Sequence, residues 1–154
     1  MTTFLIHAIP APVLAAMRTT GRASDSTARV VADGGEPVRC CLRDAAPGEP
    51  LLLVNYEPPL PESPYREVGA VFIHADSCAA SPLSVDEYPA AWSERPQVLR
   101  AYDDRGWIHP ATTVHDGTDP TAAIRAVLAE PGVVQVHSRN IAYGCYMFSA
   151  TRCV

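Results

Sequence analysis

Lysine is absent from this sequence, and all 12 of its positively charged residues are arginines. A chain without lysine cannot form a lysine Schiff base, and it cannot contain the phosphate-binding loop that ends in Gly-Lys-Ser/Thr. The sequence also lacks a CxxC pair, a GxSxG elbow and a glycine-rich nucleotide loop. These absences exclude several common enzyme motifs, and they leave open whether the protein is an enzyme.

Charged residues and long apolar runs are also scarce. Charged residues make up 19% of the chain and hydrophobic ones 47%, which is typical of a globular protein. A net charge of −5 argues against nucleic-acid binding, which needs a clustered basic face. No stretch approaches the roughly 18 apolar residues of a membrane span, and the apolar N-terminus lacks the basic start of a signal peptide. We therefore expect a soluble protein with neither nucleic-acid nor membrane partners.

The cysteines are five in number, at positions 40, 41, 78, 145 and 153, and their spacings do not repeat. In a secreted chain, an odd number would leave at least one thiol unpaired. Cys40 and Cys41 would point to opposite faces of a strand predicted over 37–44, so a bond between them is unfavourable. We expect reduced thiols and a cytoplasmic location.

Local patterns predict a single α+β domain over residues 1–154. Residues 10–21 and 118–132 have helical patterns, and Asp119 and Pro120 are suited to cap and begin the second helix. About nine short strands surround them, including the continuous apolar run 51–57 and a long strand over 65–76. Tight turns separate most of the strands, so the sheet should be mainly antiparallel or mixed.

Four sequence segments, in this order, resemble an uncharacterised bacterial family, domain of unknown function 1203. The segments are "CCLRDAAPGEPLLLVNYEP", "SPYREVGAVFIH", "VLRAYDDRGW" and "VHSRNIAYGCYMFSATR". The resemblance covers nearly the whole chain. It implies a soluble, single-domain bacterial protein with recurring polar residues near its C-terminus, and it implies no activity.

The C-terminal segment predicts a β-hairpin, with strands over 133–138 and 145–151. Two registers fit its apolar pattern equally well. If Ser138 pairs with Cys145, the thiol faces away from the His137 ring. If His137 pairs with Cys145, both side chains lie on one face with their Cβ atoms about 5 Å apart.

Cys145 is the candidate reactive thiol of this hairpin, and His137 would be its base in a cysteine-dependent enzyme. A nucleophilic thiol needs its pKa lowered by a helix N-terminus or a cation. Cys145 follows a strand turn, so the sequence favours a small buried residue over a nucleophile.

His74, Asp76 and Cys78 occupy alternate positions, so an unbroken strand through them would direct all three side chains to one face as candidate metal ligands. Zinc accepts these ligand types, but it requires a tetrahedral set, and side chains along one strand diverge. The sequence analysis therefore predicts no metal and no cofactor.

Two functional hypotheses remain. The first is a binding or catalytic site for a small polar or anionic molecule, in a pocket beside the C-terminal hairpin. Its predicted lining is His137, Asn140, Tyr56, Tyr65 and Arg100. The second is a protein-interaction module that uses the proline-rich arm 57–65 or an edge strand. No sequence feature indicates the oligomeric state.

Overall fold

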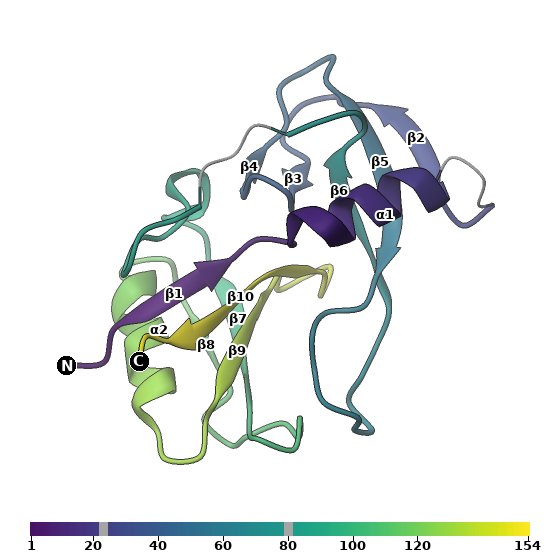
Figure 1. The fold of residues 1–154 in the computed structure, drawn as a ribbon. Helices are drawn as coiled ribbons and strands as arrows, with labels where there is room; N and C mark the ends of the chain where they lie inside the picture. The colour runs from purple at the N-terminus through teal and green to yellow at the C-terminus, as the bar shows by residue number, and fades with distance from the viewer. Residues whose placement is uncertain (22–24, 79–81) are drawn as a thin grey trace.

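Two five-stranded sheets form the framework of the computed structural model, which describes residues 1–21, 25–78 and 82–154. The first sheet has the strand order β1-β10-β9-β7-β8, and the second has the order β2-β5-β6-β3-β4. The chain starts in the first sheet, forms the second, and returns to the first (Figure 1). The elements are β1 (Phe4–His7), α1 (Ala11–Gly21), β2 (Ala28–Val31), β3 (Pro37–Val38), β4 (Arg43–Asp44), β5 (Pro50–Tyr56), β6 (Gly69–His74), a short 3-10 turn (Ala90–Trp92), β7 (Gln97–Tyr102), β8 (Thr113–His115), α2 (Pro120–Ala129), β9 (Gln135–Arg139) and β10 (Tyr146–Arg152).

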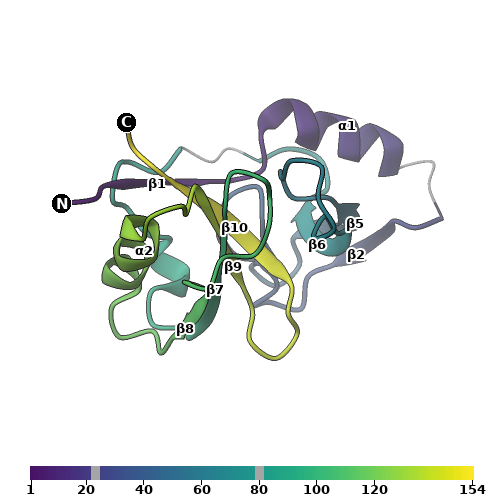
Figure 2. The same cartoon turned by 90° about the horizontal axis from the view of Figure 1, so that it is seen from below.

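The two sheets lie side by side, and each is accompanied by one helix (Figure 2). Helix α2 packs on the first sheet, where Ile124 and Leu128 are fully buried. Helix α1 lies along the second sheet, where it contacts β5. Both helices were predicted from the sequence. The Asp119 side chain accepts a hydrogen bond from the Ala122 backbone N–H at 2.9 Å, which confirms the predicted cap.

Each sheet contributes its own group of buried apolar side chains. The apolar run 51–57 predicts a buried strand, and β5 confirms it, because Leu51, Leu52 and Val54 are all buried. Among the described residues, the paired strands are antiparallel except β3 and β6, which pair in parallel at Val38 and Phe72. The predicted α+β class with mainly antiparallel or mixed sheets is therefore confirmed. The part of the chain that the structure describes contains no helix long and apolar enough to cross a membrane.

The strand predicted over 37–44 is wrong. The chain there forms two-residue strands β3 and β4, joined by a tight turn over 39–42. The Leu42 N–H donates to the Val38 carbonyl at 2.9 Å, and Leu42 adopts a positive φ of 56°. This conformation is uncommon for leucine, and the burial of the Leu42 side chain compensates for it. Cys40 and Cys41 are therefore turn residues, and they do not alternate across a sheet.

The strand predicted over 65–76 is shorter in the structure, where β6 spans Gly69–His74. The premise that residues 74, 76 and 78 follow one strand is therefore wrong. Asp76 lies beyond the strand end, where it forms an exposed ion pair with Arg29 at 3.5 Å.

Neither register proposed for the C-terminal hairpin occurs. Arg139 pairs with Tyr146, and His137 pairs with Ser149. The register shifts between Tyr146 and Phe148, as a β-bulge does. Cys145 belongs to the turn, where its carbonyl accepts a hydrogen bond from the Asn140 N–H at 2.9 Å. The Cys145 thiol and the His137 ring are therefore not cross-strand neighbours.

Candidate functional site

Three thiols and one imidazole converge where the β3–β4 turn meets the end of β6. Cys40 and Cys41 come from the turn, His74 is the last residue of β6, and Cys78 follows it after an irregular segment. The parallel pairing of β3 with β6 brings these segments together, and the Arg39 N–H donates to the Phe72 carbonyl at 2.9 Å. We refer to Cys40, Cys41, His74 and Cys78 as the thiol cluster.

The distances in the thiol cluster approach those of a metal coordination shell. The four ligand atoms all lie within 4.8 Å of one another. The His74 Nδ1 atom is 3.4 Å from the Cys40 sulfur and 3.8 Å from the Cys41 sulfur. Around a tetrahedral zinc ion, bond lengths of about 2.3 Å to sulfur and 2.0 Å to nitrogen place the ligand atoms about 3.5–3.8 Å apart. The cluster could therefore hold such an ion with small shifts of its side chains.

The other nitrogen of the His74 ring contacts a carboxylate. His74 Nε2 lies within hydrogen-bond distance of Glu49 Oε2. Glu49 also accepts hydrogen bonds from Arg43 at 3.0 and 3.3 Å and from the Ala46 N–H at 3.0 Å, and these contacts help to lower the pKa of Glu49 to about 2. Two groups face His74 Nε2, the Glu49 carboxylate and, at 3.4 Å, Arg43 Nη2. The carboxylate oxygen is the nearer of the two, so an ionised Glu49 favours the tautomer with the N–H on Nε2. The Nδ1 lone pair then faces the sulfurs, as a metal-bound histidine requires.

The three thiols have different environments. A hydrogen bond from the Cys41 thiol is the main cause that lowers the pKa of Cys40, and the His74 backbone N–H, 3.3 Å from the Cys40 sulfur, lowers it further. The same thiol–thiol contact raises the pKa of Cys41, and burial raises that of Cys78 to about 11. A bound cation would lower the pKa of all three thiols and stabilise their thiolates.

A buried arginine anchors the turn that carries Cys40 and Cys41. Arg39 is 2% exposed, and its Nε donates to the Tyr146 carbonyl of β10 at 2.7 Å. A second guanidinium nitrogen donates to the Pro37 carbonyl. Burial lowers the pKa of Arg39 to about 10, so the side chain stays charged at neutral pH. The conformation of the turn thus depends on a residue of the other sheet.

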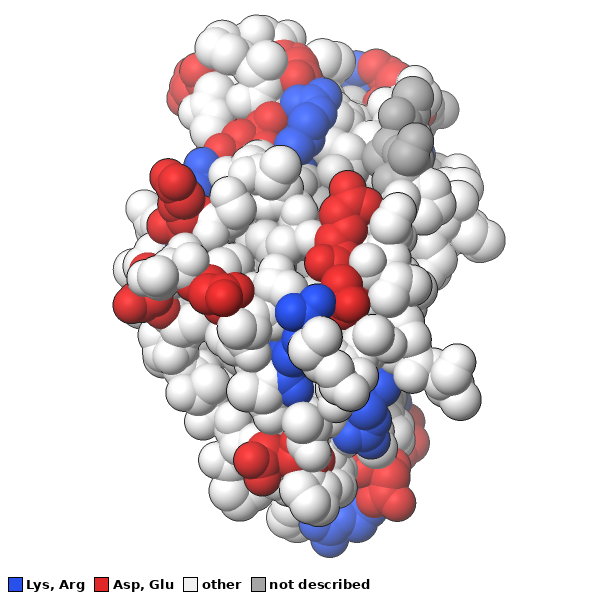
Figure 3. Space-filling view, turned by 90° about the vertical axis from the view of Figure 1, so that its left-hand side faces the viewer, with Lys and Arg blue, Asp and Glu red and all other residues white. Residues whose placement is uncertain are grey.

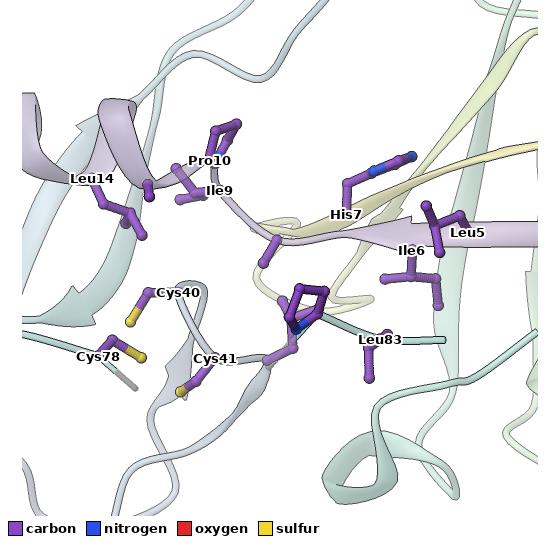
Figure 4. Close-up of a pocket in the computed structure, with 14 residues that line it drawn as sticks. Leu5, Ile6, His7, Ile9, Pro10, Leu14, Cys40, Cys41, Cys78 and Leu83 are labelled. Atoms are coloured by element: carbon purple, nitrogen blue, oxygen red, sulfur yellow. The ribbon is translucent and has the colours of Figure 1, made fainter. Parts of the chain in front are cut away.

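A cavity of about 360 Å³ adjoins the thiol cluster. Cys40, Cys41 and Cys78 form part of its wall, and their sulfurs lie close together at one end in Figure 4. The segment from Leu5 to Ala11 and the side chains of Leu14 and Leu83 form much of the remaining wall. The cluster is therefore accessible from a largely apolar cavity.

Of the residues predicted to line a pocket beside the hairpin, His137 and Tyr56 both pack against the ring of Tyr146. Tyr146 lies with its ring centroid 5.3 Å from that of His137 and 5.5 Å from that of Tyr56. His137 is fully buried, and its Nε2 is 3.0 Å from the Gln135 side-chain oxygen. Burial, together with the charges of two nearby arginines, lowers the pKa of His137 to about 3, so its ring is neutral.

Arg100 is the cross-strand partner of His137, so both side chains lie on the same face of the first sheet. The Arg100 guanidinium is engaged with Glu67 at 2.8 Å, and Arg139 contacts the same carboxylate oxygen. Two guanidinium groups therefore share one exposed carboxylate, and the three side chains together carry a net charge of +1.

The remaining predicted residues have other contacts. Asn140 forms backbone hydrogen bonds within the hairpin turn, and its carbonyl accepts from the Gly144 N–H at 3.1 Å. The Tyr65 ring packs against Trp107 at 5.7 Å. Tyr65 belongs to the proline-rich arm, which is tied to the first sheet by a hydrogen bond from Ser63 to the Gly106 carbonyl at 2.9 Å. The Cys145 sulfur is half-buried and lies 3.8 Å from the Tyr143 carbonyl.

Cys40, Cys41 and Glu49 were not predicted as site residues, and a metal site at His74, Asp76 and Cys78 was judged unfavourable from the sequence. One usable signal was present: adjacent cysteines followed by a His-x3-Cys spacing. This spacing did not lead to a predicted metal site, because residues 37–44 and 65–76 were each interpreted as one strand. In a strand, neighbouring cysteines diverge, whereas in a turn both can face the same atom.

A model of the family described as "Protein of unknown function (DUF1203)" matches residues 35–152, and the chain belongs to this family. The matched segment includes the whole thiol cluster and Glu49. No curated protein and no solved structure matches the chain.

Proposed function

We propose that the protein binds one zinc ion through Cys40, Cys41, His74 and Cys78. The observation that supports this proposal is the convergence of four ligand atoms within 4.8 Å. Three thiolates and one imidazole form a common ligand set of tetrahedral zinc sites. Soft sulfur ligands disfavour magnesium and calcium, which take oxygen ligands.

The contact between His74 and Glu49 supports the same proposal. Histidines that bind metals usually donate their second ring N–H to a carboxylate or a carbonyl, which fixes the tautomer and increases the basicity of the ligand. Here Glu49 occupies that position and is itself held by Arg43. We assign Glu49 the role of a positioning residue.

A cytoplasmic location in a bacterium is part of this proposal. All five cysteines are free thiols. Three of them are the proposed metal ligands, and they must stay reduced to bind zinc. The cytosol maintains this state, whereas an oxidising compartment does not.

Acidic and basic side chains lie next to one another on the face in Figure 3, which supports the expectation that nucleic acid is not a partner.

Elemental analysis of the purified protein tests the proposal directly. We expect one zinc per chain in protein purified without chelators, and Co²⁺ should give the visible absorption of a tetrahedral thiolate site. Cys40→Ser and His74→Ala should each lose the metal, whereas Cys145→Ser and Cys153→Ser are matched controls that should retain it. Circular dichroism checks that each variant is folded. A folded wild-type protein that binds neither zinc nor Co²⁺ would refute the proposal.

A small-molecule site beside the C-terminal hairpin is a second candidate function. A cavity of about 400 Å³ lies there, within the size range of ligand sites. Its lining includes the polar side chains of His7, Tyr56, Gln135, Tyr146, Ser149 and Thr151. These hydroxyl, amide and imidazole groups favour a neutral polar ligand over an anionic one, because no arginine is among the described residues that line the cavity.

A thermal-shift screen with sugars, nucleosides and small carboxylates tests this second candidate. A ligand that binds the folded state raises Tm by mass action. The shift should decrease in Tyr56→Phe, which removes one hydroxyl from the cavity, and persist in Tyr143→Phe, whose side chain is exposed at the hairpin tip. The hypothesis fails if no compound raises Tm, or if both variants respond as the wild type does.

A further inference from the structure

The thiol cluster differs from a sealed structural metal site because three of its sulfurs border a cavity. The cavity volume of about 360 Å³ falls at the lower end of the range for small-molecule sites, roughly 300–1,000 Å³. A structural zinc site usually has four protein ligands and no open coordination position, and the thiol cluster with its four ligands fits that description. Any reaction at this site would therefore occur at a sulfur that borders the cavity and not at an open position of the metal. A molecule that enters the cavity would therefore come close to the sulfurs of the cluster.

The cavity wall selects for small, uncharged molecules. Leu5, Ile9, Leu14 and Leu83 contribute aliphatic side chains to it. None of the described residues that line the cavity is an aspartate, a glutamate or an arginine, and burial lowers the pKa of His7, the imidazole among them. A charged ligand would therefore lose hydration on entering and meet no fixed opposite charge in this part of the wall. The sulfurs of Cys40, Cys41 and Cys78 are the nucleophilic groups that line the cavity, and in Figure 4 they lie on the same side as Leu14 and across from Leu5 and Leu83.

The environments of two of these sulfurs suggest which one would react. The Cys40 sulfur is buried and accepts the backbone N–H of His74 at 3.3 Å. A hydrogen bond to a thiolate stabilises its negative charge and makes the sulfur less nucleophilic. Cys41 is half-buried, and the hydrogen-bond contacts described for its sulfur are with the neighbouring thiols and the His74 ring, while the Arg43 guanidinium interacts with it electrostatically. Cys41 is therefore better placed to attack a molecule in the cavity.

We propose that metal-bound Cys41 is a nucleophile toward small apolar alkyl donors that enter this cavity. This inference rests on the proposed zinc site, because a bound cation would keep the thiol ionised at neutral pH. In the reaction, a sulfur lone pair forms the S–C bond while the bond between carbon and the leaving group breaks. The electron pair of that bond departs with the leaving group, so Cys41 becomes a thioether and nothing is oxidised or reduced.

Alkylation of the zinc-loaded protein, followed by peptide mapping, tests this inference. Benzyl bromide serves as the apolar electrophile and iodoacetate as the charged one. Cys145 and Cys153 are half-buried cysteines outside the thiol cluster, so they serve as controls within the same chain. We expect benzyl bromide to modify Cys41 several-fold faster than either control, and iodoacetate to show no such preference.

A cavity-blocking variant provides the second measurement. Ala11 is exposed at the start of α1 and borders the cavity, so Ala11→Trp should slow the benzylation of Cys41 without loss of zinc. Ala15→Trp, one turn further along the exposed side of the same helix, is the matched control and should react as the wild type does.

The possible failures are distinguishable. If the protein retains zinc and Cys40, Cys41 and Cys78 all stay unmodified while Cys145 and Cys153 react, the site is structural and only this inference is overturned. If Cys40 or Cys78 is modified before Cys41, the assignment to Cys41 is wrong. If the folded protein holds no zinc, the proposed function fails, and this inference fails with it.

Discussion

Substitution of Glu49 by glutamine separates a metal site from a chance group of thiols. In the structure, one carboxylate oxygen of Glu49 accepts from Arg43 and from the Ala46 N–H, and the other accepts from Arg43 and faces His74 Nε2. Glutamine has nearly the same shape, but it has only one acceptor oxygen. If this oxygen keeps the contact with Ala46, the amide NH₂ of glutamine faces the N–H of His74.

Two donors facing each other favour the other tautomer of His74. That tautomer carries its proton on Nδ1, the nitrogen that faces the sulfurs, and a protonated Nδ1 cannot bind zinc. Loss of such a carboxylate partner typically lowers metal affinity about 10–100-fold, which corresponds to about 1.4–2.7 kcal/mol. We expect Glu49→Gln to weaken zinc binding within this range.

Zinc competition with a chromophoric chelator at pH 7 measures this change. Glu62→Gln is the matched control, because Glu62 is an exposed glutamate that pairs with Arg66 in the proline-rich arm. The control should bind zinc as the wild type does. If Glu49→Gln is folded and its affinity stays within about twofold of the wild-type value, Glu49 does not position His74 for a metal, since about tenfold is the smallest loss expected.

The pH dependence of stability gives a second measurement on the same variant. The pKa of Glu49 is about 2 in the folded protein, below its ordinary value of 4.5. An acid with a depressed pKa stabilises the fold above its unfolded pKa, and this contribution is lost as the pH falls through the folded value. The stability difference between wild type and Glu49→Gln, both without metal, should therefore be constant above about pH 5 and shrink toward pH 2. A difference that does not change between these pH values would contradict the assigned contacts.

Two further predictions concern the core and the hairpin. Leu52 is buried in β5, so Leu52→Ala should lower the free energy of unfolding by about 2–4 kcal/mol in urea titrations, and a loss below about 0.5 kcal/mol would show that the strand is peripheral. His137 has its pKa lowered from 6.5 to about 3 by burial, so the unfolded chain binds one more proton between these values. As the pH is lowered from 6.5 to 3, this group should reduce the free energy of unfolding of the wild type by up to about 1.4 kcal/mol per pH unit. The dependence of the unfolding free energy on pH should be less steep in His137→Gln. Equal slopes in the two proteins would show that His137 is not buried as a neutral ring.

The elements that could be predicted from the sequence are those with local determinants. Helix α2 has its cap at Asp119 and proline at its first position, and both signals lie within one turn of the helix. The apolar run of β5 similarly identifies a buried strand without knowledge of its neighbours. These signals suffice for the fold class.

The spacing of the cysteines and His74 gives a signal for the thiol cluster, but the convergence of their side chains could not be predicted, because it depends on contacts between distant residues. The turn over 39–42 is held by the contact of Arg39 with Tyr146, a residue 107 positions away. The parallel pairing at Val38 and Phe72 then sets the turn beside the end of β6. The hairpin register failed for a related reason, since a bulge between Tyr146 and Phe148 is compatible with the same alternating pattern.

The same long-range contact gives metal binding a consequence beyond the second sheet. Arg39 immediately precedes two proposed ligands, and it donates to the carbonyl of Tyr146, whose ring contacts both Tyr56 and His137. Holding the turn in place with a metal would therefore also hold the donor that joins the two sheets. Because a ligand that binds only the folded state stabilises all parts that fold with it, zinc should stabilise the β9–β10 hairpin as well as the cluster itself. The buried guanidinium between the sheets thus links the proposed metal site to the polar cavity beside the hairpin.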